Sequence, residues 1–384
     1  MASLEGWSSA IELRPRRTVR QPTRPALAAR AAAGRAGANG LRRDRTAKPR
    51  WPLRYRPHPV SIGLGLDVGG TKILTCAVSD DGELVAETRV DSPKSPGLLL
   101  EALVEAVESV TDALGARAGD VVGAGVGVPS LVAADGALFS TPNLPALEGL
   151  PLQAAFAERL RATSGRGSWH LALDNDATCA AAGELAFGAA RETGDALIIT
   201  LGTGIGGGVV SRGRVFRGAS GFAGEFGHMV IDPTGPACHC GRHGCFEQFA
   251  SGNALARLAR RAAVEGQADR VVELAGGQPG EVRGEHVLEA AREGDPGAEA
   301  LFAELGRYLA VGIDNLVEVL DPALVILAGG LAAAGEVLLR PARAAFESSS
   351  RRGQGEHAVG IVLAGLGERA GAFGAAALGL GVVG

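Results

Sequence analysis

Two stretches of the chain, about 130 residues apart, repeat one pattern, and this repeat constrains the fold more than any other feature. In each stretch an apolar strand enters a glycine-rich turn and continues as a hairpin: "IGLGLDVGGTKILTCAVSDDGELVAETRV" from Ile62, and "DALIITLGTGIGGGVVSRGRVF" from Asp195. Helical patterns follow both. Leu100, Leu103, Val107, Val110 and Leu114 share one helix face, and so do Leu305, Leu309, Ile313, Leu316 and Leu320. The repeat predicts a duplicated α/β architecture, with two α/β domains facing across a cleft.

Charge is distributed unevenly along the chain. Residues 1–60 contain fourteen Arg and Lys against three acidic residues, whereas the remainder contains 24 basic and 39 acidic groups. The acidic remainder argues against a nucleic-acid-binding core. Residues 1–59 are rich in Arg, Ala and Pro without an apolar period, which predicts a disordered basic extension. A tail that binds nucleic acid, an organellar transit peptide and a translation start placed too early remain alternatives for this segment.

The apolar runs and the cysteines indicate a class of protein. The longest charge-free apolar runs, 323–335 and 370–384, are shorter than the roughly 20 residues that cross a membrane. Three of the five cysteines are clustered, which is unlike a disulfide framework. We therefore expect a protein of a reducing, cytoplasmic compartment.

Three apolar strands end in small residues: "LDVGGTK", "TLGTGIGGG" and "ILAGGLA". Such turns expose backbone N–H groups that can hold phosphate oxygens, and glycine permits the close approach. Gly202, Gly204 and Gly207 also match the dinucleotide pattern G-x-G-x-x-G. That pattern requires a helix directly after the turn, but the following residues have the pattern of a strand and hairpin. Phosphate-binding turns are thus favoured, with ordinary tight turns as the alternative.

A carboxylate group follows another apolar strand in "LALDND", where Asp174, Asn175 and Asp176 precede a helix predicted over 177–190. Phosphoryl transfer needs a base for the incoming hydroxyl, and the end of a strand is a suitable place for one. Asp176 is the predicted base, and Asn175 is predicted to bond a hydroxyl of the substrate. The alternative is that Asp174 or Asp176 only caps the helix.

The cysteine cluster has the spacing of a zinc knuckle. Cys238, Cys240 and Cys245 form C-x-C-x4-C, and a histidine would complete a tetrahedral set of four ligands. His228, His239 and His243 are candidates for that histidine; His239 is expected to point away, and spacing does not eliminate His243. Four ligands favour a structural ion that fixes Glu225 and Glu247 near sugar hydroxyls. Buried reduced thiols or a disulfide pair are the alternative.

These motifs, in this order and together with "PNLP", "DNDA", "GEFGH", "CHCGRHGC-x-E" and "LAGG", resemble the ROK family of repressors and sugar kinases. The resemblance implies an actin-like (ribonuclease-H-like) ATPase fold, with two α/β domains around a cleft. It places a small N-terminal domain at 60–177, with a C-terminal helix at about 368–384 packing back on it, and a large domain with the knuckle at 178–367. Its expected cofactors are structural Zn²⁺ and Mg²⁺ with ATP. The expected partners are a hexose and ATP, in a homodimer or homotetramer.

The resemblance also implies a role for each matching residue. Asp176 would be the catalytic base. The sugar would be lined by Asn143, Asn175, Asp176, Glu225, His228 and Glu247. ATP would be held by Asp67, Gly69, Gly70, Thr71, Lys72, Gly202, Thr203, Gly204, Gly329 and Gly330, with Asp67 near Mg²⁺. Zinc would be bound by His228, Cys238, Cys240 and Cys245.

The function implied is ATP-dependent phosphorylation of a hexose, glucose to glucose 6-phosphate. A kinase for fructose, mannose, allose or an N-acetylhexosamine is an alternative, as is a non-catalytic sugar-sensing regulator. The family's regulators carry an N-terminal helix-turn-helix, and residues 1–60 have no helical period that would form one. Ser130, where the family often has a small residue after G-x-G-x-P, bears only on the fit of the substrate.

Overall fold

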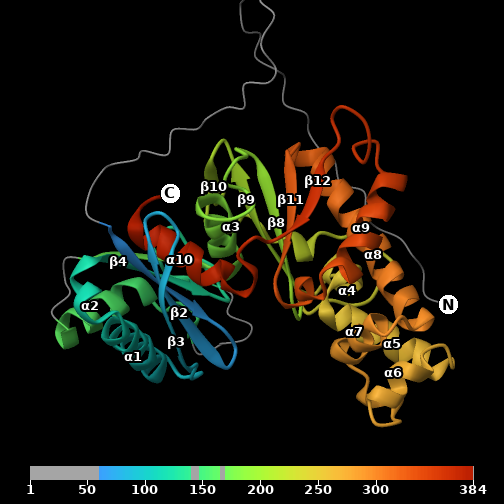
Figure 1. Cartoon of the computed structure of the whole chain (residues 1–384), viewed down its shortest axis with the longest axis horizontal. Coiled ribbons are helices and arrows are strands. Elements are labelled where there is room, and N and C mark those ends of the chain that lie inside the picture. Colours follow the sequence, from blue (N-terminus) through green and yellow to red (C-terminus); the bar gives the residue numbers. More distant parts are fainter. Residues whose placement is uncertain (1–59, 140–146, 165–168, 384) are drawn as a thin grey trace, which may run out of the picture. The chain divides into compact units, whose positions relative to one another are not determined.

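The computed structural model describes residues 60–139, 147–164 and 169–383, so the predicted disorder of residues 1–59 lies outside the described residues. Two five-stranded sheets form the framework (Figure 1). The first contains β1 (Ile62–Val68), β2 (Lys72–Ser79), β3 (Leu84–Asp91), β4 (Val121–Val128) and β7 (His170–Asn175) in the order β3-β2-β1-β4-β7. The second contains β8 (Ala196–Leu201), β9 (Ile205–Ser211), β10 (Arg214–Phe216), β11 (Leu324–Ala328) and β12 (Gly360–Leu363) in the order β10-β9-β8-β11-β12.

The two sheets share their strand directions as well as their order. In each, the first three strands form antiparallel pairs, and the remaining two add parallel to the first. The predicted duplication is confirmed. A small hairpin of β5 (Leu131–Val132) and β6 (Leu138–Phe139) stands apart from both sheets.

Helices connect and cover the strands. They are α1 (Pro96–Leu114), α2 (Leu152–Ser164), α3 (Asp176–Ala186), α4 (Glu247–Ala250), α5 (Gly252–Val264), α6 (Asp269–Leu274), α7 (Gly284–Arg292), α8 (Pro296–Leu320), α9 (Glu336–Ser349) and α10 (Ala370–Leu380). Short 3-10 turns are η1 (Gly115–Asp120), η3 (Phe226–His228), η4 (Pro279–Glu281), η5 (Gly330–Ala334) and η6 (Gly367–Arg369). No helix of the described residues is long and apolar enough to cross a membrane.

Most of the apolar residues on the two predicted helix faces are buried. On α1, Leu103, Val107 and Val110 are fully buried, as the period predicts. On α8, Leu320 was expected on the buried face but is 41% exposed. Leu320 is the last residue of the helix, so its side chain lies where the neighbouring elements no longer cover it. The helix predicted over 177–190 is also shorter, because α3 ends at Ala186.

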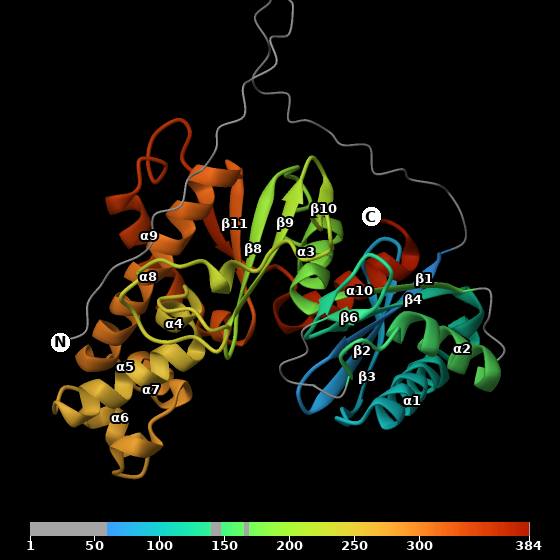
Figure 2. The ribbon, with the colours of Figure 1, turned by 180° about the vertical axis from the view of Figure 1, so that it is seen from behind.

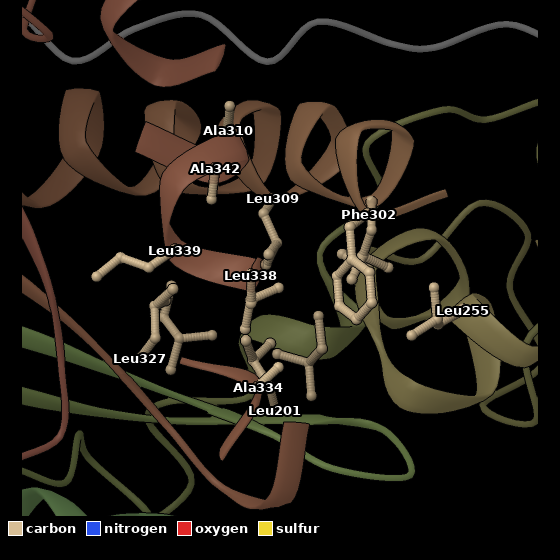
Figure 3. Packing of buried hydrophobic residues seen from close by; sticks show 14 of the residues in the cluster. Leu201, Leu255, Phe302, Leu309, Ala310, Leu327, Ala334, Leu338, Leu339 and Ala342 are labelled. Atoms are coloured by element: carbon tan, nitrogen blue, oxygen red, sulfur yellow. The ribbon is translucent and has the colours of Figure 1, made fainter. Parts of the chain in front are cut away.

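Each sheet packs with its helices around a core of its own. In the second, Leu201 of β8 and Leu327 of β11 lie among Phe302, Leu309 and Leu338 from α8 and α9 (Figure 3). In the first, the residues of β1 and β4 pack against α1 and α2.

The helices α3 and α10 each pack on the sheet that does not contain the strand preceding them in the chain. α3 follows the last strand of the first sheet but packs on β8 and β9 of the second. α10 follows the last strand of the second sheet but packs on β1 and β4 of the first, and the two helices pack against each other (Figures 1 and 2). The contact requires glycine: a Cβ on Gly65 would lie 1.8 Å from the Ala372 carbonyl oxygen, and one on Gly374 would lie 1.6 Å from the Cys179 carbonyl oxygen.

Candidate active site

Two carboxylates lie at the carboxyl ends of parallel strands in the first sheet, and therefore at the same end of that sheet. Asp67 is the penultimate residue of β1, and Asp176 directly follows β7; both strands run parallel to β4 between them. Burial raises the pKa of Asp67 to about 7, and the negative charge of Asp176 contributes to that rise. Gly371 of α10 leaves room for the Asp67 carboxylate, because a Cβ there would lie 2.7 Å from Oδ2. The two acidic groups therefore form one electrostatic site.

Asn175, rather than either aspartate, caps α3. Its Oδ1 accepts hydrogen bonds from the N–H groups of Ala177 (2.9 Å) and Thr178 (3.1 Å). Its Nδ2 donates to the Ser130 carbonyl oxygen (3.2 Å) and to Oδ1 of Asp176 (2.9 Å). All the hydrogen-bonding groups of the Asn175 amide are thus engaged within the protein.

The Asp176 carboxylate is held through one oxygen. Oδ1 accepts the Asn175 bond and another from the N–H of Ala177 (2.8 Å), while no neighbouring donor in the described part of the chain bonds Oδ2. Burial raises the pKa of Asp176 to about 6; the Ala177 bond opposes this rise and the charge of Glu225 adds to it. A fixed carboxylate with one available oxygen and a raised pKa can accept a proton near neutral pH.

Asp174 is paired with an arginine from the other sheet. It is 5% exposed, and its Oδ2 lies 2.7 Å from Nε of Arg217, which follows β10. Burial raises the pKa of Asp174, and the Arg217 guanidinium opposes the rise. Arg217 had no role in the sequence analysis, and no motif spacing pointed to it.

The three glycine turns contain glycines of two kinds. A Cβ would meet a backbone or side-chain oxygen at Gly69 (Lys72 O, 2.9 Å), Gly204 (Glu247 Oε2, 2.5 Å) and Gly329 (Leu201 O, 2.6 Å). At Gly70, Gly202 and Gly330 a Cβ would have no atom within 4 Å, and none of the three has a positive φ. The fold does not require glycine at these three positions, so each turn offers one backbone segment that another molecule can approach closely.

Backbone contacts show which segments of the chain lie beside the glycine turns. Gly329 approaches the backbone of Leu201, which brings the third turn next to the second. The N–H of Gly252 donates to the Gly202 carbonyl oxygen (2.8 Å), so the start of α5 joins the second turn, a contact that the sequence analysis did not predict. Thr71 is exposed, and the Lys72 ammonium is paired with Asp91.

The glycines that follow the second turn serve packing. Gly206 and Gly208 face Ala177 and Ala181 of α3, and Gly207 faces the ring of Phe226. The residues after the turn form strand β9, whereas the dinucleotide pattern requires a helix at this position.

The predicted zinc ligands converge. The ligand atoms of His228, Cys238, Cys240 and Cys245 all lie within 4.8 Å of one another. Sγ of Cys240 and Cys245 are 3.5 Å apart, and Sγ of Cys238 is 3.7 Å from Nδ1 of His228. A tetrahedral ion with Zn–S and Zn–N bonds of usual length separates its ligands by about 3.4–3.8 Å. The set therefore fits zinc, and the cysteines are free rather than disulfide-bonded.

The three candidate histidines separate clearly. His228 belongs to the cluster, and His243 is exposed and outside it. His239 was expected to point away from the cysteines, but its Nδ1 lies 3.8 Å from Sγ of Cys238 and 3.3 Å from Oε1 of Glu247. The His239 ring therefore lies beside the buried Glu247 carboxylate.

Glu247 and Glu225 connect the knuckle with the carboxylate site. Glu247 contacts Cys238 through Oε1 and faces Gly204 of the second turn through Oε2. Oε2 of Glu225 lies 3.8 Å from Nε2 of His228, and the charge of Glu225 is felt at Asp176. Contacts thus connect His228 with Cys238 and Glu225, and Cys238 with Glu247, and the charge of Glu225 acts on Asp176. Asn143 lies outside the described residues.

Two sheets with the same strand order, joined by the helices α3 and α10, define an actin-like ATPase fold. The sequence pattern of the ROK family matches residues 63–381. The chain belongs to the ROK family.

Similar proteins include both enzymes and a regulator. The glucokinase of Streptomyces coelicolor is 34% identical over 323 residues, which cover 83% of this chain and 98% of that protein. The structure of a ROK family glucokinase from Streptomyces griseus in complex with glucose and AMPPNP aligns with a TM-score of 0.71 at 35% identity, covering 83% of this chain and 99% of that one. The xylose repressor of Caldicellulosiruptor bescii is 27% identical over 75% of this chain and 70% of that protein.

Proposed function

We propose that this protein is an ATP-dependent sugar kinase that phosphorylates a hexose, with glucose as the substrate and glucose 6-phosphate as the product. The observation that carries the proposal is the Asp176 carboxylate, which is fixed through Oδ1 and has Oδ2 available. A regulator that only senses sugar has no need of a positioned base. The similarity to glucokinases over most of the chain supports the same conclusion.

In the proposed reaction Oδ2 of Asp176 accepts the proton of the sugar hydroxyl while the hydroxyl oxygen attacks the γ-phosphorus of ATP. The bond between that phosphorus and the β,γ-bridging oxygen breaks, and ADP leaves. Asn175 acts as a positioning residue, because its Nδ2 holds the other oxygen of the base. We propose that Glu225, His228 and Glu247 line the sugar, together with Asn143. Asn175 and Asp176 complete that set, although Asn175 would contact sugar only by giving up one of its present bonds.

Asp67 and the turns form the proposed nucleotide site. A carboxylate oxygen is the ligand that Mg²⁺ prefers, and the half-buried Asp67 carboxylate, which has no ion-pair partner among the described residues, fits that use. When bound, Mg²⁺ would neutralise charge on the phosphates. Gly70, Gly202 and Gly330 would present backbone to ATP, with Gly69, Thr71, Lys72, Thr203, Gly204 and Gly329 completing the turns.

The function is tested by measuring ADP release with glucose, fructose, mannose, allose and N-acetylglucosamine in turn, each with ATP and with polyphosphate as donor. We expect the highest kcat/KM for glucose with ATP. A higher value for another hexose would replace glucose in the proposal. Tight sugar binding in calorimetry without turnover of any hexose would establish the regulator instead.

The nucleotide site has its own test. Gly70→Ala, Gly202→Ala and Gly330→Ala are expected to raise KM for ATP or lower kcat about tenfold or more, because a methyl group would occupy the space of the ligand. The folded chain has room for each methyl, so the thermal unfolding midpoints should stay near that of the wild type. Gly97→Ala in α1, which also has open space, is the matched control and should change neither KM for ATP nor kcat. Unchanged kinetics in all three variants would remove these turns from the nucleotide site.

The proposal also includes a structural role for the metal. The zinc ion would be structural, since four protein ligands leave it no open position.

The boundaries 60–177 and 178–367, with residues 368–384 joining the first domain, remain our proposed domains. A homodimer or homotetramer is proposed, and light scattering on the purified chain tests it.

A further inference from the structure

The geometry points to Arg217 as a positioning residue for the base, acting through Asp174, and to the loop 217–224 as the element that joins the base to the sugar-binding carboxylates. This inference rests on the proposed kinase function. It adds a residue from the second sheet to a site whose base lies at the end of the first.

A continuous series of hydrogen bonds links Arg217 to Asp176. Nε of Arg217 donates to Oδ2 of Asp174 (2.7 Å), and the other oxygen of Asp174 accepts the backbone N–H of Asn175 (2.9 Å). The Asn175 side chain then caps α3 and holds Oδ1 of Asp176. Arg217 therefore fixes the residue that in turn fixes the base.

The location of the ion pair makes it a link between the two sheets. Asp174 belongs to β7 of the first sheet, and Arg217 follows β10 of the second. α3, which begins with Asp176, packs on β8 and β9 of the second sheet. The end of β7 and the start of α3 are thus attached to the same sheet by a charge pair and by packing.

The loop 217–224 also contacts the small hairpin of β5 and β6 at two places. A Cβ on Gly221, where φ is +93°, would lie 2.3 Å from the Val132 carbonyl oxygen of β5. The ring of Phe222 stacks on that of Phe139 of β6, with centroids 5.4 Å apart and planes at 18°. The N–H of Ala223 donates to the Arg217 carbonyl oxygen (3.1 Å), which closes the loop on itself. Glu225 comes directly after this fixed loop.

The burial of Asp174 shows why an arginine is suited to this role. A carboxylate that is 5% exposed needs a charged partner, and a guanidinium forms directional hydrogen bonds with it. Arg217 itself is only one-third exposed at its side chain, so solvent competes weakly for the pair. The direction of the bond matters for catalysis, because small displacements of a reacting group lower rates steeply.

The test compares Arg217→Met, Arg217→Lys and the double variant Asp174→Asn/Arg217→Met with the wild type. We expect Arg217→Met to lower kcat for the hexose about 10–100-fold while KM for ATP changes less than about twofold. Arg217→Lys should recover part of kcat, because an ammonium group can still pair with Asp174. The double variant leaves no unpaired charge, so it should regain the unfolding midpoint but not kcat.

Arg352→Met is the matched control. It removes another ion pair with an N–O distance of 2.7 Å, to Asp321, from a half-buried arginine outside the described site. Its kcat should equal that of the wild type. If the double variant folds with wild-type kcat, or if Arg217→Met keeps kcat within about twofold of the control, the pair is merely structural and the inference is overturned.

Wild-type turnover separates this inference from the proposed function. Absence of ADP release from the wild type with every hexose would refute the function. Turnover in the wild type, with no loss in the Arg217 variants, would refute only the positioning role.

Discussion

At the scale of single residues, the same residue type serves different purposes within a few positions. Gly202 has open space around it, Gly204 faces a buried carboxylate, and Gly206 lies against α3. The sequence pattern treated these glycines alike, because a spacing rule does not include what each missing side chain would touch. Only the first kind gives direct support to a site for another molecule.

The carboxylates give a prediction about pH. Burial raises the pKa of Asp176 to about 6 and that of Asp67 to about 7, from 3.8 in an exposed group. The folded chain therefore binds these protons more tightly than the unfolded chain, and the free energy of unfolding should fall as pH rises from about 4 to about 7. Asp176→Asn should abolish turnover but stabilise the folded chain at about pH 8 by up to about 3 kcal/mol.

Thermal unfolding at two pH values checks this prediction. At about pH 4 the carboxyl is protonated in the folded wild type, so the variant should gain much less stability there. For the wild type, kcat/KM should fall by at least tenfold per pH unit below about pH 6, because the Asp176 base is then protonated, as is Asp67 with its pKa of about 7. A variant that unfolds at a lower temperature than the wild type at about pH 8, or that retains turnover, would contradict the role of Asp176.

At the scale of structural elements, the knuckle and its neighbours hold distant residues together. Glu247 contacts the thiol of Cys238 and also approaches Gly204, so the knuckle and the second turn share one side chain. The C-x-C-x4-C spacing was sufficient to predict that the three thiols lie together. The histidine could not be chosen from spacing, since His228 reaches the cluster through the fold of η3 and His243 is turned outward.

Removal of the metal is the prediction at this scale. Elemental analysis should find one zinc ion per chain in the wild type and none in His228→Ala or Cys240→Ser, and the unfolding free energy of these variants should be lower by about 4 kcal/mol or more at saturating metal. His243→Ala, which alters an exposed histidine outside the cluster, should retain the zinc. Metal loss from His243→Ala with retention in His228→Ala would reverse the ligand assignment.

At the scale of the whole molecule, the packing of α3 and α10 on the two sheets explains several glycines of the strands. Glycines of β1 and β4 admit α10, and glycines of β9 admit α3. The repeat in the sequence predicted the two sheets. The repeat did not predict that α3 and α10 pack on the other sheet, because their small residues have no strong apolar period; for α10 alone, the resemblance to the ROK family implied this packing.

Deletion of residues 1–58 should leave kcat, KM and the unfolding midpoint unchanged. The ROK family match begins at residue 63, and the first strand begins at Ile62. Enzyme kinetics and calorimetry on the shortened chain test this expectation, with the full chain as the control. A lower kcat or a lower midpoint would assign this basic segment a function in catalysis or folding.

The sequence by itself determined the features that local chemistry encodes: the strands and most helix faces by their periods, the turns by glycine, and the thiol ligands by their spacing. Only the tertiary structure decided that Asn175 caps α3, that Arg217 pairs with Asp174, that Leu320 is exposed and that His239 faces Glu247. The physical reason is that a period follows from backbone geometry within one element. The partner of a buried charge, by contrast, depends on which elements the fold brings together from distant parts of the chain.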